Sequence, residues 1–211
     1  MARWDEQAGG TMAVFYDSIE PKLVDFINRQ HMFFVGTAAA DGRVNVSPKG
    51  LDSFRVLGPH QVAWLSGTGS GNETAAHIRQ VPRMTIMFCS FEHRPWILRL
   101  YGTPTMVQPG DDRWDELLAL FPPMLGARQI YLLDVDEAMT ACGYGVPLYS
   151  FEGERETLHL WSKKKGHDGL VRYQQEKNSV SIDGLDTGLQ TEELLGEDQD
   201  EAVPAPSGSS A

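Results

Sequence analysis

The stretch MFFVGTAAADGRVNVSPKG, residues 32–50, decides the fold class of this chain. Residues 32–37 are an apolar run of the kind that favours strands, and residues 44–47 follow as the returning strand. Asp41-Gly42 stands between them, and this dipeptide supplies the positive φ angles of a tight turn. The stretch therefore predicts an antiparallel β-hairpin.

Hairpins of the same kind recur along the chain. Further strands are predicted at residues 54–57, 62–65, 84–91, 97–107 and 129–135, and short helices at residues 17–30, 73–80, 114–121 and 157–176, the last interrupted near Gly166. Antiparallel hairpins with few helices between them indicate a barrel and not a doubly wound sheet. We therefore expect a mainly β (α+β) fold, an antiparallel β-barrel with short peripheral helices.

Length and composition bound the remaining possibilities. The chain has 211 residues, 41% of them apolar, which is enough for one domain with a sizeable core. No stretch approaches the roughly 20 apolar residues of a membrane span, and the first 15 residues lack the apolar run of a signal peptide. We expect a soluble, cytoplasmic protein that does not associate with membranes. Cys89 and Cys142 are too few for a disulfide framework and lack zinc-site spacing.

The net charge of −11 is concentrated at one end of the chain. Six acidic residues and no basic residue lie within residues 191–211, so that only −5 belongs to residues 1–190. That acidic segment, rich in Pro and Ser at its end, has almost nothing apolar to bury, and we predict that it is disordered. Nucleic-acid binding requires a basic surface, and only Lys163-Lys164-Lys165 offers one, so we expect no nucleic-acid partner.

A glycine-rich loop, SGTGSGN at residues 66–72, lies between a predicted strand and a predicted helix. Small residues expose backbone N–H groups, and a helix N-terminus adds a partial positive charge suited to phosphate. Ser66, Thr68, Ser70 and Asn72 add side-chain donors. The glycine spacing and the flanking hairpins do not match the dinucleotide-binding fingerprint. A flexible surface loop is the alternative interpretation.

Two cations in predicted strands are further candidates for a phosphate site. Ser47-Pro48-Lys49-Gly50 ends the first hairpin and places Lys49 where it could accompany a phosphate, unless it is simply solvated. Arg99 lies inside an apolar strand, where burial would be costly without an anion, although alternation could equally point it at water. The six histidines show no metal-ligand spacing, and no nucleophile motif such as GxSxG is present, so we expect neither a metal site nor covalent hydrolysis.

Taken in order, these motifs resemble those of the pyridoxamine 5′-phosphate oxidase-like family, the FMN-binding split barrels, over roughly residues 14–150. The resemblance rests on FFVGTAAADGRVNVSPKG at 33–50, VAWLSGTGSGN at 62–72, VPRMTIMF at 81–88 and LRLYGTPTMV at 98–107. The segments SPKG and LRLYG are similar to the SPRG and LRVxG patterns of one flavin-binding branch. The resemblance implies a split barrel with FMN at a homodimer interface.

The resemblance also implies the residues that hold the cofactor. They are Ser47, Pro48, Lys49, Gly50, Ser66, Thr68, Ser70, Gly71, Asn72, Thr74 and Arg99, with Trp161 and Lys163 as contacts from the second chain. The Arg-Lys pair that binds phosphate in true pyridoxamine phosphate oxidases is replaced by Glu73 and Thr74. This departure speaks against oxidation of pyridoxamine phosphate and leaves Lys49 and Arg99 as the phosphate cations.

The sequence thus predicts a split-barrel domain at 14–150, a helical extension packing on it at 151–190 and a disordered tail at 191–211. The leading hypothesis for function is an FMN-dependent oxidoreductase acting on a small molecule, with unassigned catalytic residues. Three alternatives stay open: a reductase that uses deazaflavin F420, a flavin- or haem-binding protein without turnover, and a dimeric interaction protein without cofactor. The motifs name neither the substrate nor the electron donor.

Overall fold

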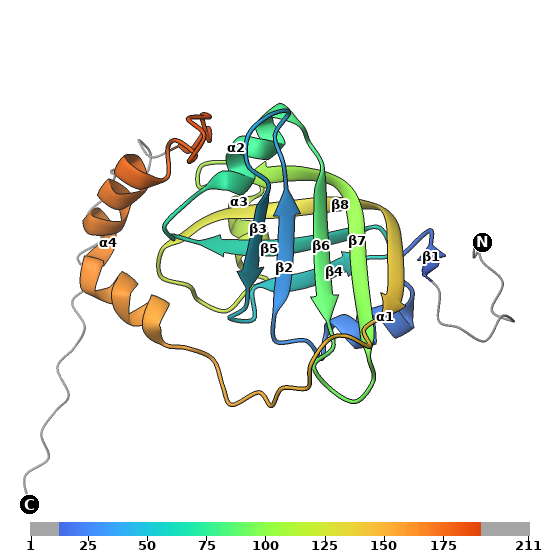
Figure 1. Cartoon of the computed structure of the whole chain (residues 1–211). Coiled ribbons are helices and arrows are strands. Elements are labelled where there is room, and N and C mark those ends of the chain that lie inside the picture. Colours follow the sequence, from blue (N-terminus) through green and yellow to red (C-terminus); the bar gives the residue numbers. More distant parts are fainter. Residues whose placement is uncertain (1–12, 191–211) are drawn as a thin grey trace, which may run out of the picture.

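Eight strands form one antiparallel sheet that curls into a split barrel in the computed structural model, which describes residues 13–190 (Figure 1). The strands are β1 (Val14–Tyr16), β2 (Phe33–Thr37), β3 (Asn45–Lys49), β4 (Phe54–Gly58), β5 (Gln61–Gly67), β6 (Met84–Cys89), β7 (Trp96–Val107) and β8 (Ala127–Cys142). The helices are α1 (Pro21–Ile27), α2 (Glu73–Gln80), α3 (Trp114–Leu118) and α4 (Thr157–Lys177). The fold class predicted from the hairpins is confirmed.

The two longest strands organise the sheet, whose order is β3-β2-β6-β7-β8-β5-β4. β8 pairs with β7 from Ile130 to Cys142, with β5 along its first half and with β1 at residues 138–140. The register shifts between Tyr101 and Gly102, where a side chain on Gly102 would overlap the backbone carbonyl of Asp134. Glycine is therefore required where β7 bends over β8.

Alternation along β5 and β8 divides the core into two layers. Trp64 and Tyr131 point into the barrel, whereas Leu65 and Ile130 point outward beneath α3. On the outer side Leu117 of α3 closes the second layer. β5 is consequently buried on both faces, and its sequence is a continuous apolar run instead of an alternating one.

Aromatic rings fill the middle of the barrel. The rings of Trp64 and Tyr131 stack with centroids 4.5 Å apart, and Phe54 contacts Phe33 and Phe88 edge-on, each at 5.0 Å. Such pairs add about 0.5–1.5 kcal/mol each beyond the area they bury. These rings form the aromatic centre of the inner core layer.

The chain beyond the barrel turns back onto it. Residues 143–156, which we call the strap, carry no regular secondary structure and lead to α4 (Figure 1, orange). Gly166 has φ 66° and breaks α4 into two halves, as predicted. Gln174 of the second half donates to Thr68 (2.7 Å), and Asn178 donates to the Gly69 carbonyl (2.9 Å), so this half is bonded to the glycine-rich loop. The acidic tail predicted at 191–211 lies outside the described residues.

Several elements differ from the sequence expectation, and the largest differences concern β8, β1 and α1. β8 runs to Cys142, well beyond the predicted end at residue 135, because Asp134 and Asp136 occupy exposed positions that do not interrupt the pairing. β1 was not predicted, since three residues form a strand only by pairing with β8. α1 begins at Pro21 and not at residue 17, in agreement with the preference of proline for the first turn of a helix. No helix within residues 13–190 is long and apolar enough to cross a membrane.

Candidate functional site

A cavity of about 760 Å³ lies beside the end of β3, and we call it the β3 cavity. Four segments line it: the residues before β2, the end of β3 with the following turn, the loop after β6, and residues 149–161 of the strap and α4. Among the residues predicted from the sequence, Pro48, Lys49, Gly50 and Trp161 line this cavity. Its size lies within the range of about 300–1,000 Å³ that is usual for cofactor and small-molecule sites.

Lys49 points from β3 toward the inside of the barrel. It stands opposite Phe33 in the sheet, and its Nζ lies 5.3 Å from the centroid of the Trp64 ring. Burial, with a smaller contribution from the charge of Arg128, lowers the pKa of Lys49 to about 8. No hydrogen bond or ion pair holds its ammonium group within residues 13–190.

Arg128 is a second buried cation, which sequence reasoning missed. Only 5% of the residue is exposed; Nη1 donates to the Gly71 carbonyl (3.1 Å), Nη2 donates to Ser66 Oγ (3.3 Å), and Nε is buried without a partner. No carboxylate within residues 13–190 pairs with it. Burial lowers the pKa of its guanidinium, and this side chain contributes to the lowered pKa of Lys49. The charges of Lys49 and Arg128 therefore influence each other, although Lys49 lines the β3 cavity and Arg128 is not part of its lining.

The glycine-rich loop contacts Arg128 through two of its residues. Ser66 Oγ and the Gly71 carbonyl both accept hydrogen bonds from Arg128. Thr68 Oγ1 is bonded to Gly126 and Gln174, and Ser70 is exposed. The loop is thus fixed against α4 as well as against β8, so the alternative of a loose surface loop does not describe it.

The helix after the loop uses its polar side chains within the protein. Asn72 is buried at the first position before α2, but its amide donates to the Asn178 carbonyl (3.1 Å) and does not cap the helix. Thr74 Oγ1 accepts a bond from Asn45 (3.3 Å). Glu73 accepts a bond from the backbone N–H of Ile182 (3.0 Å). The start of α2 therefore offers no cation, and the three side chains there bond to neighbouring segments.

The remaining predicted residues differ in where they lie relative to these cations. Arg99 faces outward, because it alternates with Leu98 and Leu100, which point into the core. Ser47 faces inward like Lys49, and its hydroxyl is buried without a hydrogen-bond partner. In α4, Trp161 contacts Tyr173 edge-on at 5.0 Å, while Lys163 is exposed.

The outer face that carries Arg99 is an apolar row across six strands. Strand pairing aligns Pro48, Phe34, Met87, Arg99, Met139 and Phe15. Arg99 thus lies between two methionines, and the sheet separates it from the inward-pointing Lys49. Pro48 belongs both to this row and to the lining of the β3 cavity, so the cavity opens at the edge of the row.

Comparison with known proteins agrees with this architecture. The family model for pyridoxamine 5′-phosphate oxidase matches residues 19–142. The chain belongs to the pyridoxamine 5′-phosphate oxidase family. A curated member, the family protein ustO of Aspergillus flavus, is 38% identical over 192 residues, which are 82% of this chain and 77% of that protein. The family expected from the motifs is confirmed.

Two solved structures are similar to this member of the pyridoxamine 5′-phosphate oxidase family. HutZ, the haem storage protein of Vibrio cholerae, is 18% identical, with 59% of this chain and 95% of that chain covered and a TM-score of 0.46. A pyridoxamine 5′-phosphate oxidase-related, FMN-binding protein of Nostoc punctiforme is 19% identical, with 56% and 76% covered and a TM-score of 0.41.

Proposed function

We propose that this chain binds FMN in the β3 cavity, with the phosphate at Lys49 and Arg128, and that it acts as an FMN-dependent oxidoreductase. One observation carries the proposal: the half-buried Lys49 and the buried Arg128 influence each other electrostatically, and no acidic side chain of residues 13–190 forms an ion pair with either. Burying such charges unpaired costs several kcal/mol, which an anionic ligand would offset.

The donors at the site suit a phosphate group. An arginine fork can bind two phosphate oxygens at once, and a lysine ammonium adds a compact charge. Arg128 is already oriented by Ser66 and by the Gly71 carbonyl, while its Nε keeps an unused hydrogen. These residues would hold the phosphate, and this arrangement replaces the missing Arg-Lys pair at Glu73 and Thr74.

The rest of the cavity suits a flat aromatic group. Leu158 and Trp161 of α4 line it, and the buried Trp64 lies beneath Lys49. When bound, FMN supplies hydride or electron transfer, and the protein supplies binding, orientation and exclusion of water. The residues of this chain therefore act as positioning groups, and no side chain is assigned a proton-transfer role.

We extend the proposal to a homodimer that completes the cavity. The outer row through Phe34, Met87 and Met139 is apolar and only partly buried, and Val46 on the same face is 66% exposed. A second copy laid on this face would cover these side chains and close the cavity at Pro48. Light scattering tests this proposal: a dimer is expected, and a monomer at micromolar concentration would contradict it.

A cofactor titration tests the function. Purified protein is titrated with FMN, deazaflavin F420 and haem while the visible absorption spectrum is recorded. FMN is expected to bind tightly, and the complex is expected to be reduced by a nicotinamide donor and reoxidised by an acceptor. Preference for F420 or haem would replace the proposed cofactor. Binding of FMN without any reduction would leave a flavin-binding protein that does not turn over.

A further inference from the structure

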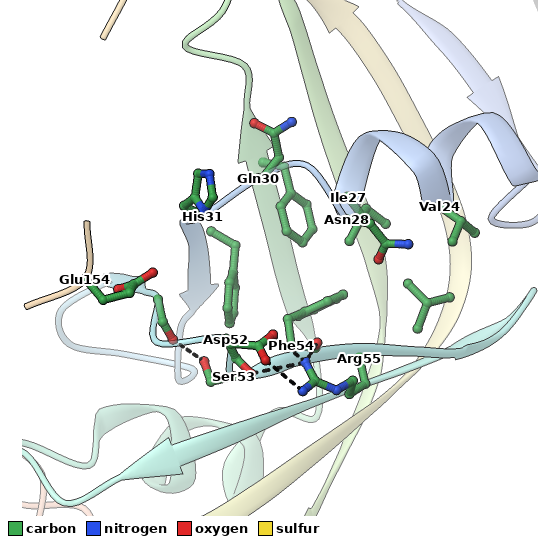
Figure 2. Close-up of a pocket in the computed structure, with 14 residues that line it drawn as sticks. Val24, Ile27, Asn28, Gln30, His31, Asp52, Ser53, Phe54, Arg55 and Glu154 are labelled. Atoms are coloured by element: carbon green, nitrogen blue, oxygen red, sulfur yellow. Dashed lines mark hydrogen bonds and ion pairs between the residues drawn. The ribbon is translucent and has the colours of Figure 1, made fainter. Parts of the chain in front are cut away.

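A second pocket, of about 510 Å³, lies on the other side of the turn that follows β3 (Figure 2). Its walls are α1 and the residues after it, the first residues of β4, and Glu154 of the strap; we call it the α1 pocket. Gln30, His31, Gly50 and Glu154 also line the β3 cavity, so the two spaces are neighbours separated by these residues.

The floor of the α1 pocket is aromatic. Phe33, Phe54 and Phe88 all line it, and only Phe54 is partly exposed. Phe54 is fixed by its edge-on contacts with the other two rings. A rigid phenyl floor suits a small apolar body, and the face of such a ring attracts a cation.

Arg55 is the one arginine in the lining of the α1 pocket, and its guanidinium already donates to other groups of the protein. Arg55 makes a two-point ion pair with Asp52 (2.7 and 3.1 Å), and its Nε donates to the Leu120 carbonyl (2.8 Å). It also lies 5.2 Å over the Phe121 ring. Figure 2 shows the pair at the pocket edge. This arginine has no free donor edge for a phosphate or carboxylate, in contrast to Arg128.

Glu154 leaves the α1 pocket with unbalanced negative charge. Its carboxylate accepts one long hydrogen bond from the backbone N–H of Leu51 (3.4 Å), and no basic side chain of residues 13–190 pairs with it. Asp52, the other acidic residue of the lining, is neutralised by Arg55. The pocket therefore favours a cation and disfavours an anion.

We infer that the α1 pocket binds a small organic cation, with its apolar body against Phe54 and its positive charge near Glu154. This ligand class carries no phosphate or carboxylate, which separates the α1 pocket from the proposed FMN site. The inference does not rest on the proposed FMN site, because Phe54 and Asp52 do not line the β3 cavity; Glu154 lines both spaces, and for that reason the test is run with and without FMN.

The test uses three probes of similar size: benzyltrimethylammonium, benzyl alcohol and benzoate. Binding to the full chain is followed by amide NMR, with and without FMN. We expect the cation to bind most tightly and to shift the signals of Asn28, His31 and Ser53. Benzoate binding as tightly as the cation, or shifts centred on Leu158 and Trp161, would overturn the inference.

Two variants and a control sharpen this test. Glu154→Gln is expected to weaken benzyltrimethylammonium binding about three-fold and to leave benzyl alcohol unchanged, since a partly exposed ion pair contributes little. Phe54→Leu is expected to weaken benzyltrimethylammonium and benzyl alcohol by a similar factor, because the aromatic body of both probes would contact Phe54. Glu152→Gln, an exposed strap residue outside the lining, is the control. Equal affinities in Glu154→Gln and the control would contradict the assigned charge contact. Because Glu154 is exposed, Glu154→Gln is expected to fold normally. The test of the charge contact therefore remains valid even if Phe54→Leu does not fold.

Discussion

Arg55 and Arg128 both donate hydrogen bonds within the protein, and they differ in what balances their charge. Arg55, at the start of β4, forms a two-point ion pair with the carboxylate of Asp52, and its Nε donates to the Leu120 carbonyl. Arg128, at the start of β8, donates to one hydroxyl and one backbone carbonyl, and its Nε has no hydrogen-bond partner. Arg55 is also the more exposed of the two.

We propose that this difference separates a structural arginine, Arg55, from a ligand-binding one, Arg128. A chain that buries a guanidinium without an acidic partner loses solvation that its own contacts do not restore. Proteins retain such a destabilising residue where a ligand supplies the missing interaction, because functional sites often lower the stability of the fold. Four predictions test whether Arg128 and Lys49 bind the ligand and whether Arg55 and Arg99 do not.

Arg128→Gln is expected to have the largest effect. It removes the charge and the fork, and FMN affinity should fall about 100-fold, in keeping with charged hydrogen bonds of about 1.5–3 kcal/mol. The ligand-free protein should keep its stability. The matched control is Arg55→Gln, which should lower the free energy of unfolding by about 1–2 kcal/mol and leave FMN affinity unchanged. Absorption titration and chemical denaturation measure both quantities, and equal FMN affinities in the two variants would remove the distinction.

Lys49→Met keeps the length of the side chain and removes its charge. FMN affinity should fall about 20-fold because one phosphate contact is lost. The ligand-free protein should become more stable by about 1 kcal/mol, since an unpaired, half-buried charge is replaced by an apolar group. Thermal and chemical denaturation without FMN check the second effect. A destabilised variant would show that Lys49 serves the fold instead.

Raising the pH should separate affinity from stability. With its pKa at about 8, Lys49 loses its proton as the pH rises from 7 to 9, and FMN affinity should fall about ten-fold. The unfolded lysine keeps its proton up to its ordinary value of 10.5. Between pH 8 and 10.5 the unfolded state therefore binds more protons, and this group makes the ligand-free protein more stable as pH rises. Lys49→Arg should abolish the fall in affinity, and a fall that persists in it would assign the titration to another group.

Arg99→Gln is expected to have the smallest effect, a change in FMN affinity of two-fold or less. Arg99 lies on the outer face, and the sheet separates it from Lys49. Its effect should be compared with that of Arg128→Gln under the same conditions. A ten-fold loss would mean that Arg99 of the partner subunit reaches the cofactor across the proposed interface.

Local sequence signals were sufficient for most of the barrel. The Asp41-Gly42 turn and the apolar runs identified β2 to β7, because hairpins pair segments that are neighbours in the chain. The length of β8 could not be predicted in this way. It depends on pairing with β1, more than 120 residues away, and on exposed positions that tolerate Asp134 and Asp136.

The candidate site was predicted only where its residues follow one another in sequence. Lys49 was found because the SPKG segment ends a strand beside a predicted turn. Arg128 was missed because its partners, Ser66 and Gly71, lie 62 and 57 residues away and meet it only through the pairing of β5 with β8. The alternation of Arg99 with Leu98 and Leu100 was a usable signal that this arginine faces away from the core.

The break at Gly166 divides α4 into two halves that contact different parts of the protein. Its first half brings Trp161 to the β3 cavity, and its second half holds Thr68 through Gln174. The family model ends at residue 142, before either half. A protein shortened to the residues that define the family would therefore keep the barrel strands but lose one wall of the cavity and the anchor of the glycine-rich loop. Comparing this chain with its relatives over residues 19–142 alone would therefore leave out part of the proposed binding site.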